Sequence, residues 1–137
     1  MEGFRVIEHT ADVGIVAHGR DLREAYVNAA RGLFSIIVDS GEIAEDTCRR
    51  VEATATDREA LLVEWLNQLI YLFDVDNLIF KTFDILQLTN TGLRANCYGE
   101  KIVPGRHHIN IGVKAATYHM LKIEEENGFR AHVLFDI

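Results

Sequence analysis

Apolar positions in the first part of the chain change from a strand-like to a helix-like spacing. Residues 4–8 and 13–18 predict two short strands, separated by the polar segment His9-Thr10-Ala11-Asp12. A helix is expected to begin at Asp21, whose carboxylate can accept a backbone N–H while Glu24 reaches back. An apolar stripe then runs to near Asp39-Ser40-Gly41 and consists of Leu22, Ala25, Tyr26, Ala29, Ala30, Leu33, Phe34 and Ile37.

A second helix is predicted to be buried on nearly all sides. Residues 50–56 alternate apolar and polar side chains, which predicts a strand, and Thr56-Asp57-Arg58-Glu59 then has the form of a capping box. A helix that is apolar almost all round is typical of a position between two layers. Only a narrow polar stripe interrupts the apolar residues that follow, and it consists of Glu64, Asn67, Gln68 and Tyr71.

The rest of the chain predicts strands joined by tight turns, over residues 79–88, 93–100, 109–116, 118–125 and 129–136. Asn127-Gly128 is typical of a two-residue hairpin loop, because both loop positions need positive φ. The whole pattern predicts an α+β fold in a single domain over residues 1–137. We expect mostly antiparallel sheets, with the two main helices packed in a layered β/α/β arrangement.

The predicted hairpin also fixes a register for the two last strands. If Asn127 and Gly128 alone form the loop, Glu125 lies opposite Arg130, a favourable pair of opposite charges. The same register places His119 opposite Asp136, at the end of the last strand.

Composition and charge restrict the partners. The chain has 137 residues and a net charge of −7, and its basic residues are scattered, so strong direct binding to nucleic acid is disfavoured. No apolar run approaches the roughly 20 residues of a membrane span, and the N-terminus lacks a signal peptide. Cys48 and Cys97 are expected to be reduced and mostly buried, and His107-His108 to lie on the surface. These features predict a cytoplasmic protein without a membrane partner.

Two segments offer candidate metal ligands. Asp12 lies in a tight connection between strands, where its carboxylate either bonds the local backbone or binds a metal. Asp136-Ile137 offers several oxygen donors at the end of an apolar strand, unless it is a solvated tail. Such donors suit Ca²⁺, Mg²⁺ or Mn²⁺ better than Zn²⁺. The sequence has no phosphate-binding glycine loop, so a nucleotidase or hydrolase acting alone has no motif support.

Four segments, in order along the whole chain, resemble the archease family. They are His9-Thr10-Ala11-Asp12, residues 62–74 (LVEWLNQLIYLFD), residues 114–119 (KAATYH) and residues 133–137 (VLFDI). The resemblance implies a small α+β protein that is not itself an enzyme. It implies an activator of the RtcB-type RNA ligase of tRNA splicing, which promotes guanylylation and multiple turnover of the ligase and broadens its use of nucleotides.

The resemblance also implies a single metal site formed by Asp12, Asp136 and Ile137, with Lys114 and His119 as supporting groups. The expected cofactor is a divalent metal ion with oxygen ligands, with Ca²⁺ as first choice and Mg²⁺ or Mn²⁺ as alternatives. Two other functions stay open. One is a general chaperone or modulator of RNA-processing enzymes, and the other is a metal-dependent hydrolase that uses Asp12, Asp136 and His119.

Overall fold

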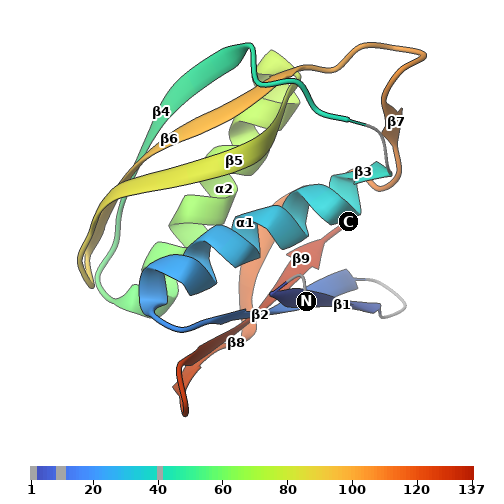
Figure 1. Ribbon diagram of the computed structural model, residues 1–137. Helices are drawn as coiled ribbons and strands as arrows, with labels where there is room; N and C mark the ends of the chain where they lie inside the picture. The colour runs from blue at the N-terminus through green and yellow to red at the C-terminus, as the bar shows by residue number, and fades with distance from the viewer. Residues whose placement is uncertain (1–2, 9–11, 40–41) are drawn as a thin grey trace.

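Two antiparallel sheets enclose a layer of helices, as Figure 1 shows for the computed structural model. The structure describes residues 3–8, 12–39 and 42–137. One sheet has the order β1 (Phe4–Glu8), β2 (Asp12–Gly19), β9 (Phe129–Asp136) and β8 (Ala115–Glu125). The other has the order β4 (Thr47–Thr54), β6 (Gly92–Lys101) and β5 (Leu78–Leu88). The helices between them are α1 (Leu22–Ile37) and α2 (Arg58–Asp76), so the predicted α+β class and layering are confirmed.

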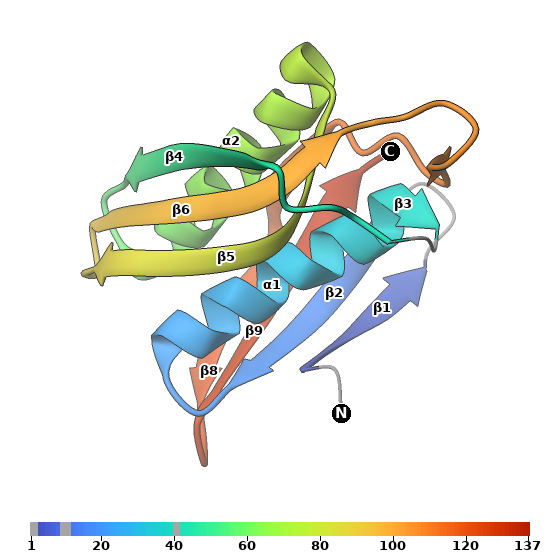
Figure 2. The same cartoon turned by 45° about the horizontal axis from the view of Figure 1, so that its top comes forward.

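The core lies in the helix layer and joins both sheets. Trp65 of α2 is fully buried, and its indole N–H donates to the carbonyl of Tyr26 in α1 at 3.0 Å. The Phe34 ring of α1 packs edge-on to Phe80 at 5.8 Å and stacks on Phe83 at 6.0 Å, measured between centroids. Aromatic pairs at these separations add to the stability already gained from area burial. Figure 2 shows α1 crossing beneath the three-stranded sheet that carries these two phenylalanines.

The start of α1 agrees with the predicted cap, except in what Glu24 binds. The Asp21 carboxylate accepts the Glu24 N–H at 2.8 Å, as an N-cap should. Glu24 reaches back one residue further than a capping box requires and accepts the Arg20 N–H at 2.9 Å. The helix ends at Ile37, slightly earlier than predicted, because Val38 becomes extended in β3 (Val38–Asp39) and pairs with β7 (His108–Ile109).

Helix α2 is as buried as predicted, but its cap is shifted. Asp57, not Thr56, is the N-cap residue, and its carboxylate accepts the Ala60 N–H at 2.8 Å. The first position of the predicted capping box was therefore wrong by one residue. Asn77 ends the helix in the left-handed conformation, with φ 56°, which asparagine adopts more readily than most residues. No helix among the described residues is long and apolar enough to cross a membrane.

The predicted register of the last hairpin was wrong. The loop holds three residues, since Glu125 pairs with Phe129, and Glu124 rather than Glu125 lies opposite Arg130. Further along, the register shifts between Thr117 and Lys122, where β8 bulges out of the ladder. The Cα partner of Asp136 on β8 is consequently Ala115 and not His119.

The strand predicted over residues 109–116 is mostly absent. His108–Ile109 pairs with β3, Ala115 and Ala116 belong to the start of β8, and residues 110–114 between them have no regular secondary structure. The Asn110 N–H donates to the carbonyl of Ile37 at 2.8 Å, so this segment follows the end of α1 instead of a sheet. The apolar spacing of residues 109–116 thus reflects packing against the helix layer, as Ile109, Ile111 and Val113 contribute to the core.

A buried ion cluster corrects the prediction for His107. Its side chain is buried, accepts the Val103 N–H at Nδ1 (2.9 Å), and places Nε2 3.1 Å from a carboxylate oxygen of Glu100. Glu100 is also buried; it accepts the Ala44 N–H and pairs with Arg106. Only His108 of the pair is exposed, as predicted. The cluster ties the segment that follows β3 to the loop that follows β6.

The two cysteines differ in exposure. Cys97 is buried on β6, and burial raises the pKa of its thiol to about 12, so it stays protonated and inert. Cys48 is exposed on β4, contrary to the expectation that both thiols are mostly buried. Both are free, as predicted.

We expect Glu100→Gln to destabilise the protein in a pH-dependent way. The hydrogen bond from Arg106 holds the pKa of Glu100 below its ordinary value of 4.5, with further contributions from Ala44 and His107. A lowered pKa in the folded state stabilises the fold above the unfolded pKa, and this stabilisation disappears as the pH falls through the folded pKa. Urea unfolding should therefore show a deficit for the variant at pH 7 that shrinks below pH 4.5.

Asp84→Asn is the matched control, because Asp84 is an exposed carboxylate on β5 whose cross-strand neighbour, Asn96, carries no charge. It should unfold like the parent protein at every pH. A deficit for Glu100→Gln that stays constant down to low pH would show that the charge of Glu100 does not stabilise this cluster.

Candidate metal site

The first residue of β2 and the last residue of β9 are both aspartates, and they pair. Asp12 and Asp136 are Cα partners in the antiparallel ladder between these strands. Directly opposite residues share a face of the sheet and have neighbouring Cβ atoms. The structure therefore brings together two carboxylates that are far apart in the sequence. Ile137, which follows at once, is partly exposed.

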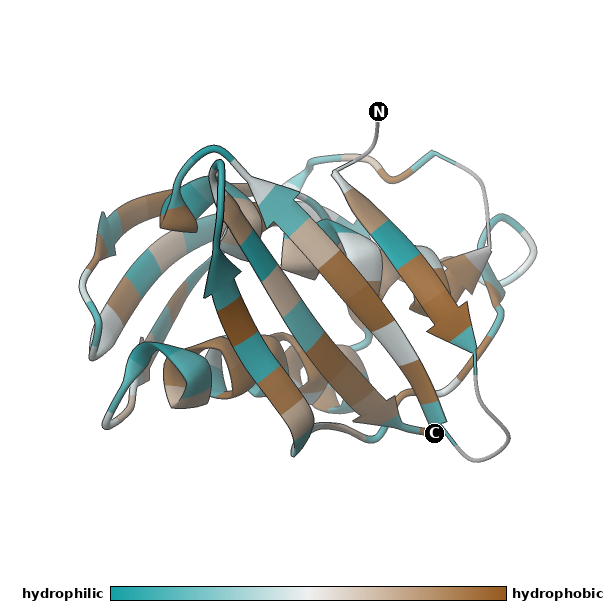
Figure 3. Ribbon diagram, turned by 90° about the horizontal axis from the view of Figure 1, so that it is seen from below, coloured by the Kyte–Doolittle hydropathy of each residue, from teal (hydrophilic) through white to brown (hydrophobic). Residues whose placement is uncertain are grey.

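This face of the sheet is the one turned away from the helices. Ile15 of β2 packs toward α1, since a Cβ on Gly32 would lie 3.2 Å from the Ile15 side chain. Side chains alternate between the two faces along a strand, so Asp12, three positions before Ile15, lies on the opposite face. Figure 3 views this open face, on which no described helix or strand lies, and the C-terminus is at its lower edge.

Asp12 has an oxygen that the described residues leave unpartnered. Its Oδ1 is buried and accepts no hydrogen bond from any residue that the structure describes. A buried carboxylate oxygen without a donor is costly unless a proton or a cation compensates it. The donor set fits a hard divalent cation, because carboxylate and main-chain oxygens are the ligands that Ca²⁺ and Mg²⁺ prefer.

The supporting residues predicted for this site have different positions. Lys114 lies beside the tail, where its backbone N–H donates to the carbonyl of Asp136 at 2.8 Å. His119 lies within the register shift of β8, between Thr117 and Lys122, and is exposed, and its N–H donates to the Thr117 hydroxyl at 3.3 Å. The ladder thus supports a place near the tail for Lys114 and not for His119.

Asn67 is a positioning residue that the sequence indicated only as part of a polar stripe. Its Oδ1 accepts the Ala116 N–H at 2.8 Å, and its Nδ2 donates to the Ala116 carbonyl at 3.4 Å. The amide of α2 therefore fixes the start of β8, next to the residue that pairs with Asp136. Thr117 adds a hydrogen bond from its hydroxyl to the Leu134 carbonyl at 3.1 Å.

Residues 9–11 of the first candidate segment lie outside the described residues. In the part of the chain that the structure describes, no three His, Cys, Asp or Glu side chains gather as metal ligands. The candidate site therefore consists of two carboxylates and the main-chain oxygens of the tail.

Comparison with known proteins places these residues in a family. The model of the archease protein family matches residues 4–137. The chain belongs to the archease family. Protein archease of Methanosarcina acetivorans is 37% identical over 139 residues, with 98% of this chain and 95% of that protein covered. Protein archease of Pyrococcus abyssi is 38% identical over 128 residues, with 91% of this chain and 90% of that protein covered.

Solved structures of archease relatives share the fold. The solution structure of protein 1598 of Methanobacterium thermoautotrophicum is 36% identical, has a TM-score of 0.82, and matches over the whole of both chains. A crystal structure described as an archease, possible chaperone, from Thermotoga maritima has a TM-score of 0.60 over 96% of this chain and 94% of that chain. At 22% identity, this second likeness shows the fold alone.

We expect Asp12→Asn to stabilise the protein when divalent ions are removed. Two like charges directly opposite each other on a sheet destabilise it by about 0.2–1 kcal/mol, and the amide removes one of them. Urea unfolding in EDTA should show an increase of that size, which decreases at high salt.

Asp84→Asn, an exposed change on β5, is the control and should leave the free energy of unfolding unchanged. If Asp12→Asn lowers the stability in EDTA by more than about 1 kcal/mol, the Asp12 carboxylate stabilises the apo fold and is not held against a like charge.

Proposed function

We propose that this protein is an activator of an RtcB-type tRNA-splicing RNA ligase, acting through a divalent-metal site at Asp12 and Asp136. Two findings support the proposal: membership of the archease family, and the direct cross-strand pairing of the two aspartates. The pairing is the main support for the proposal, because it brings two ordinary acidic residues together in one site at the edge of an open sheet face. The partner is the ligase, which the protein would prepare for guanylylation and repeated turnover.

The metal ligands in this proposal are the carboxylates of Asp12 and Asp136 and the main-chain or terminal oxygens of Ile137. Ca²⁺ is the first choice, with Mg²⁺ and Mn²⁺ as alternatives that use the same ligand types. A bound divalent ion supplies positive charge that can stabilise phosphate oxygens. Backbone contacts hold the ligands in place, since Lys114 fixes the Asp136 carbonyl and Asn67 fixes the adjoining strand.

The chain's own contribution is to present this charge at an accessible place. Asp136 and Ile137 are exposed at the end of β9, and the neighbouring face of the sheet is open. A rigid sheet holds functional groups more accurately than a loop does. The ligase would provide the nucleotide site, and this protein would bring its cation to that site.

One observation favours a second candidate function, that of a chaperone or modulator of RNA-processing enzymes. Tyr118 and Met120 in the bulge of β8 expose 64% and 72% of their area, on the same strand as Ala115, the partner of Asp136. Exposed apolar side chains of this size are a means of binding other proteins. The hydrolase alternative loses support, because the register separates His119 from Asp136.

The first prediction of this proposal concerns metal binding itself. Added Ca²⁺ should raise the melting temperature of the EDTA-treated protein, since a ligand at one hundred times its Kd stabilises the fold by about 2.7 kcal/mol. Asp12→Asn and Asp136→Asn should abolish the shift, and Asp84→Asn should retain it. Equal shifts in the parent protein and both site variants would place the metal elsewhere.

The second prediction concerns the ligase. The parent protein should accelerate guanylylation of the cognate RtcB-type ligase, and Asp12→Asn or Asp136→Asn should reduce this stimulation by roughly tenfold or more, since even the loss of an outer-shell partner of a metal costs about 10–100-fold. Residues added after Ile137 should impair stimulation if its terminal carboxylate takes part. Autoradiography with labelled GTP measures the rate.

Asp84→Asn again provides the control and should stimulate like the parent protein. Full stimulation by both site variants would reject the metal site. If the parent protein does not stimulate the ligase but suppresses aggregation of unrelated proteins, and Met120→Ser removes that suppression, the chaperone function is the correct one.

A further inference from the structure

A small apolar hollow lies in the open face of the four-stranded sheet. Its floor is Gly14 of β2, where a Cβ would lie 2.5 Å from Cδ2 of Leu134, the Cα partner of this glycine. Because residue 14 has no side chain, a space remains beside the Leu134 side chain. The hollow has a volume of about 130 Å³, and among the residues that line it are Ile7, Gly14, Met120, Lys122, His132 and Leu134.

One wall of the hollow comes from the irregular part of β8. Met120 and Gly14 both line the hollow, although β9 lies between their strands in the sheet. The backbone of Met120 has the left-handed φ of 56°, which is uncommon for a residue other than glycine, and its side chain is 72% exposed. The register shift of β8 thus places a flexible apolar side chain beside the hollow, and methionine adapts its shape readily to a partner.

The hollow lies next to the candidate metal site on the same face of the sheet. Gly14 and Leu134 form the cross-strand pair two positions from Asp12 and Asp136, which is about 7 Å along the strands. No described helix or strand covers this face (Figure 3). A protein that brings its own nucleotide site to a metal at the two aspartates therefore covers the hollow as well.

The volume of the hollow decides what kind of group it can hold. Small-molecule sites have volumes of about 300–1,000 Å³, more than twice the volume of this hollow at the least. A single aliphatic side chain is of the right size. Protein interfaces obtain much of their affinity from a few anchor side chains that fill such pockets.

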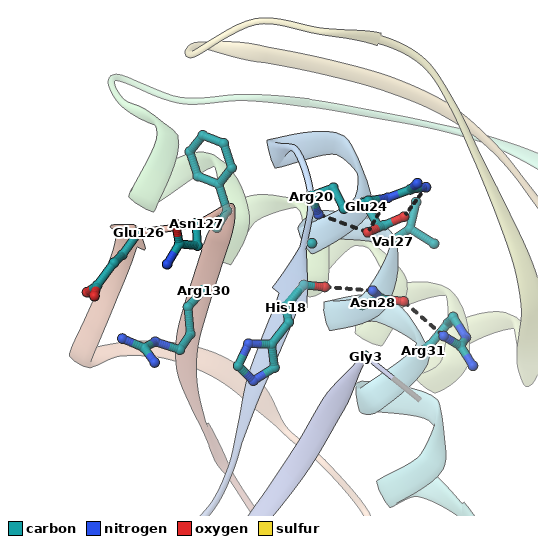
Figure 4. A pocket seen from close by; sticks show the side chains of 12 residues that line it. Gly3, His18, Arg20, Glu24, Val27, Asn28, Arg31, Glu126, Asn127 and Arg130 are labelled. Atoms are coloured by element: carbon teal, nitrogen blue, oxygen red, sulfur yellow. Dashed lines mark hydrogen bonds and ion pairs between the residues drawn. The ribbon is translucent and has the colours of Figure 1, made fainter. Parts of the chain in front are cut away.

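The cations of a larger cavity, of about 600 Å³, at the other end of this sheet are already engaged. Figure 4 shows that Arg20, Arg31 and Arg130 of its lining point to different sides. Arg20 is ion-paired with Glu24 at 3.1 Å, and Arg130 with Glu124 at 3.2 Å. The apolar hollow is therefore the more available of the two sites.

The open face carries opposite charges on the two sides of the hollow. On one side are the two aspartates. The next two cross-strand rows on the other side contain three permanent cations, Arg5, Lys122 and Arg130, and one carboxylate, Glu124. Glu124 is shared, at 3.8 Å from Lys122 and 3.2 Å from Arg130, so it does not neutralise this side. Complementary charges on a partner would fix its orientation on the face.

We propose that the open face docks onto the ligase and that the hollow over Gly14 receives one apolar side chain of the ligase. This inference rests on the proposed function. The face defines the chemistry of the partner surface: an apolar side chain at the hollow, acidic residues toward Arg5 and Lys122, and the nucleotide site toward the two aspartates.

Titration of the cognate ligase with this protein, followed as guanylylation with labelled GTP, tests the docking. Met120→Gly removes one wall of the hollow and suits the positive φ, and Gly14→Ala places a methyl group on the floor. Each should raise the concentration for half-maximal stimulation by roughly tenfold, the effect of losing an anchor contact, and leave the maximal stimulation unchanged. Asp12→Asn should instead lower the maximal stimulation.

Leu86→Ser is the matched control, since Leu86 is also an exposed apolar residue on a strand but lies in the other sheet. It should stimulate like the parent protein at every concentration. Arg5→Gln should raise the half-maximal concentration several-fold at low salt and little at high salt. If Gly14→Ala does not fold, Met120→Gly still decides the matter, because glycine suits the backbone there.

Three results would overturn the docking. If the parent protein stimulates and both hollow variants keep its half-maximal concentration, the hollow is rejected and the proposed function stands. If Leu86→Ser loses as much as Met120→Gly, the effect is a general one of apolar surface and the hollow is again rejected. If the parent protein neither binds nor stimulates the ligase, the docking and the proposed function are both wrong.

Discussion

The pairing of β2 with β9 fixes the positions of the two aspartates to which we assign the metal site. β2 and β9 are the two inner strands of the four-stranded sheet, and their ladder runs without a register shift from Asp12 and Asp136 to Gly19 and Phe129. Because side chains alternate between the faces, a slip of one residue would turn every side chain of a strand to the other face. One register therefore sets the acidic pair at one end and the pair of His18 and Arg130 at the other.

The helix layer in turn keeps this sheet from moving against the other. Trp65 and Tyr26 join α2 to α1 by a buried hydrogen bond, and Asn67 joins α2 to β8. Because the Asn67 side chain bonds the backbone of Ala116, the position of α2 determines the position of β8 in the sheet. The open face of the four-stranded sheet can stay free of helices because its other face already supplies the core.

Sequence patterns predicted the elements better than their ends. The stripe of α1 and the all-round burial of α2 could be read directly, since the period of apolar residues follows the helix. The register of β8 could not, because it depends on a loop of three residues and on a further shift around Met120, whose positive φ of 56° no sequence signal announces. The burial of His107 was also hidden, since it depends on a loop that folds back so that His107 meets Glu100 at the end of β6. The prediction that Asp12 and Asp136 form one site came from the family resemblance. The β2–β9 ladder gives the physical reason why the two residues are neighbours.

The bulge in β8 has a consequence for how molecules of this protein meet in solution. β8 is an outer strand of its sheet, with one row of backbone groups that no neighbouring strand uses. A straight edge of this kind is a template on which a strand of another molecule can add, and aggregation begins in that way. The left-handed residue Met120 breaks the edge in the middle, and the charged Lys122 and Glu124 follow it. The bulge that shifts the register of β8 thus also hinders the addition of a strand from another molecule to this edge of the sheet.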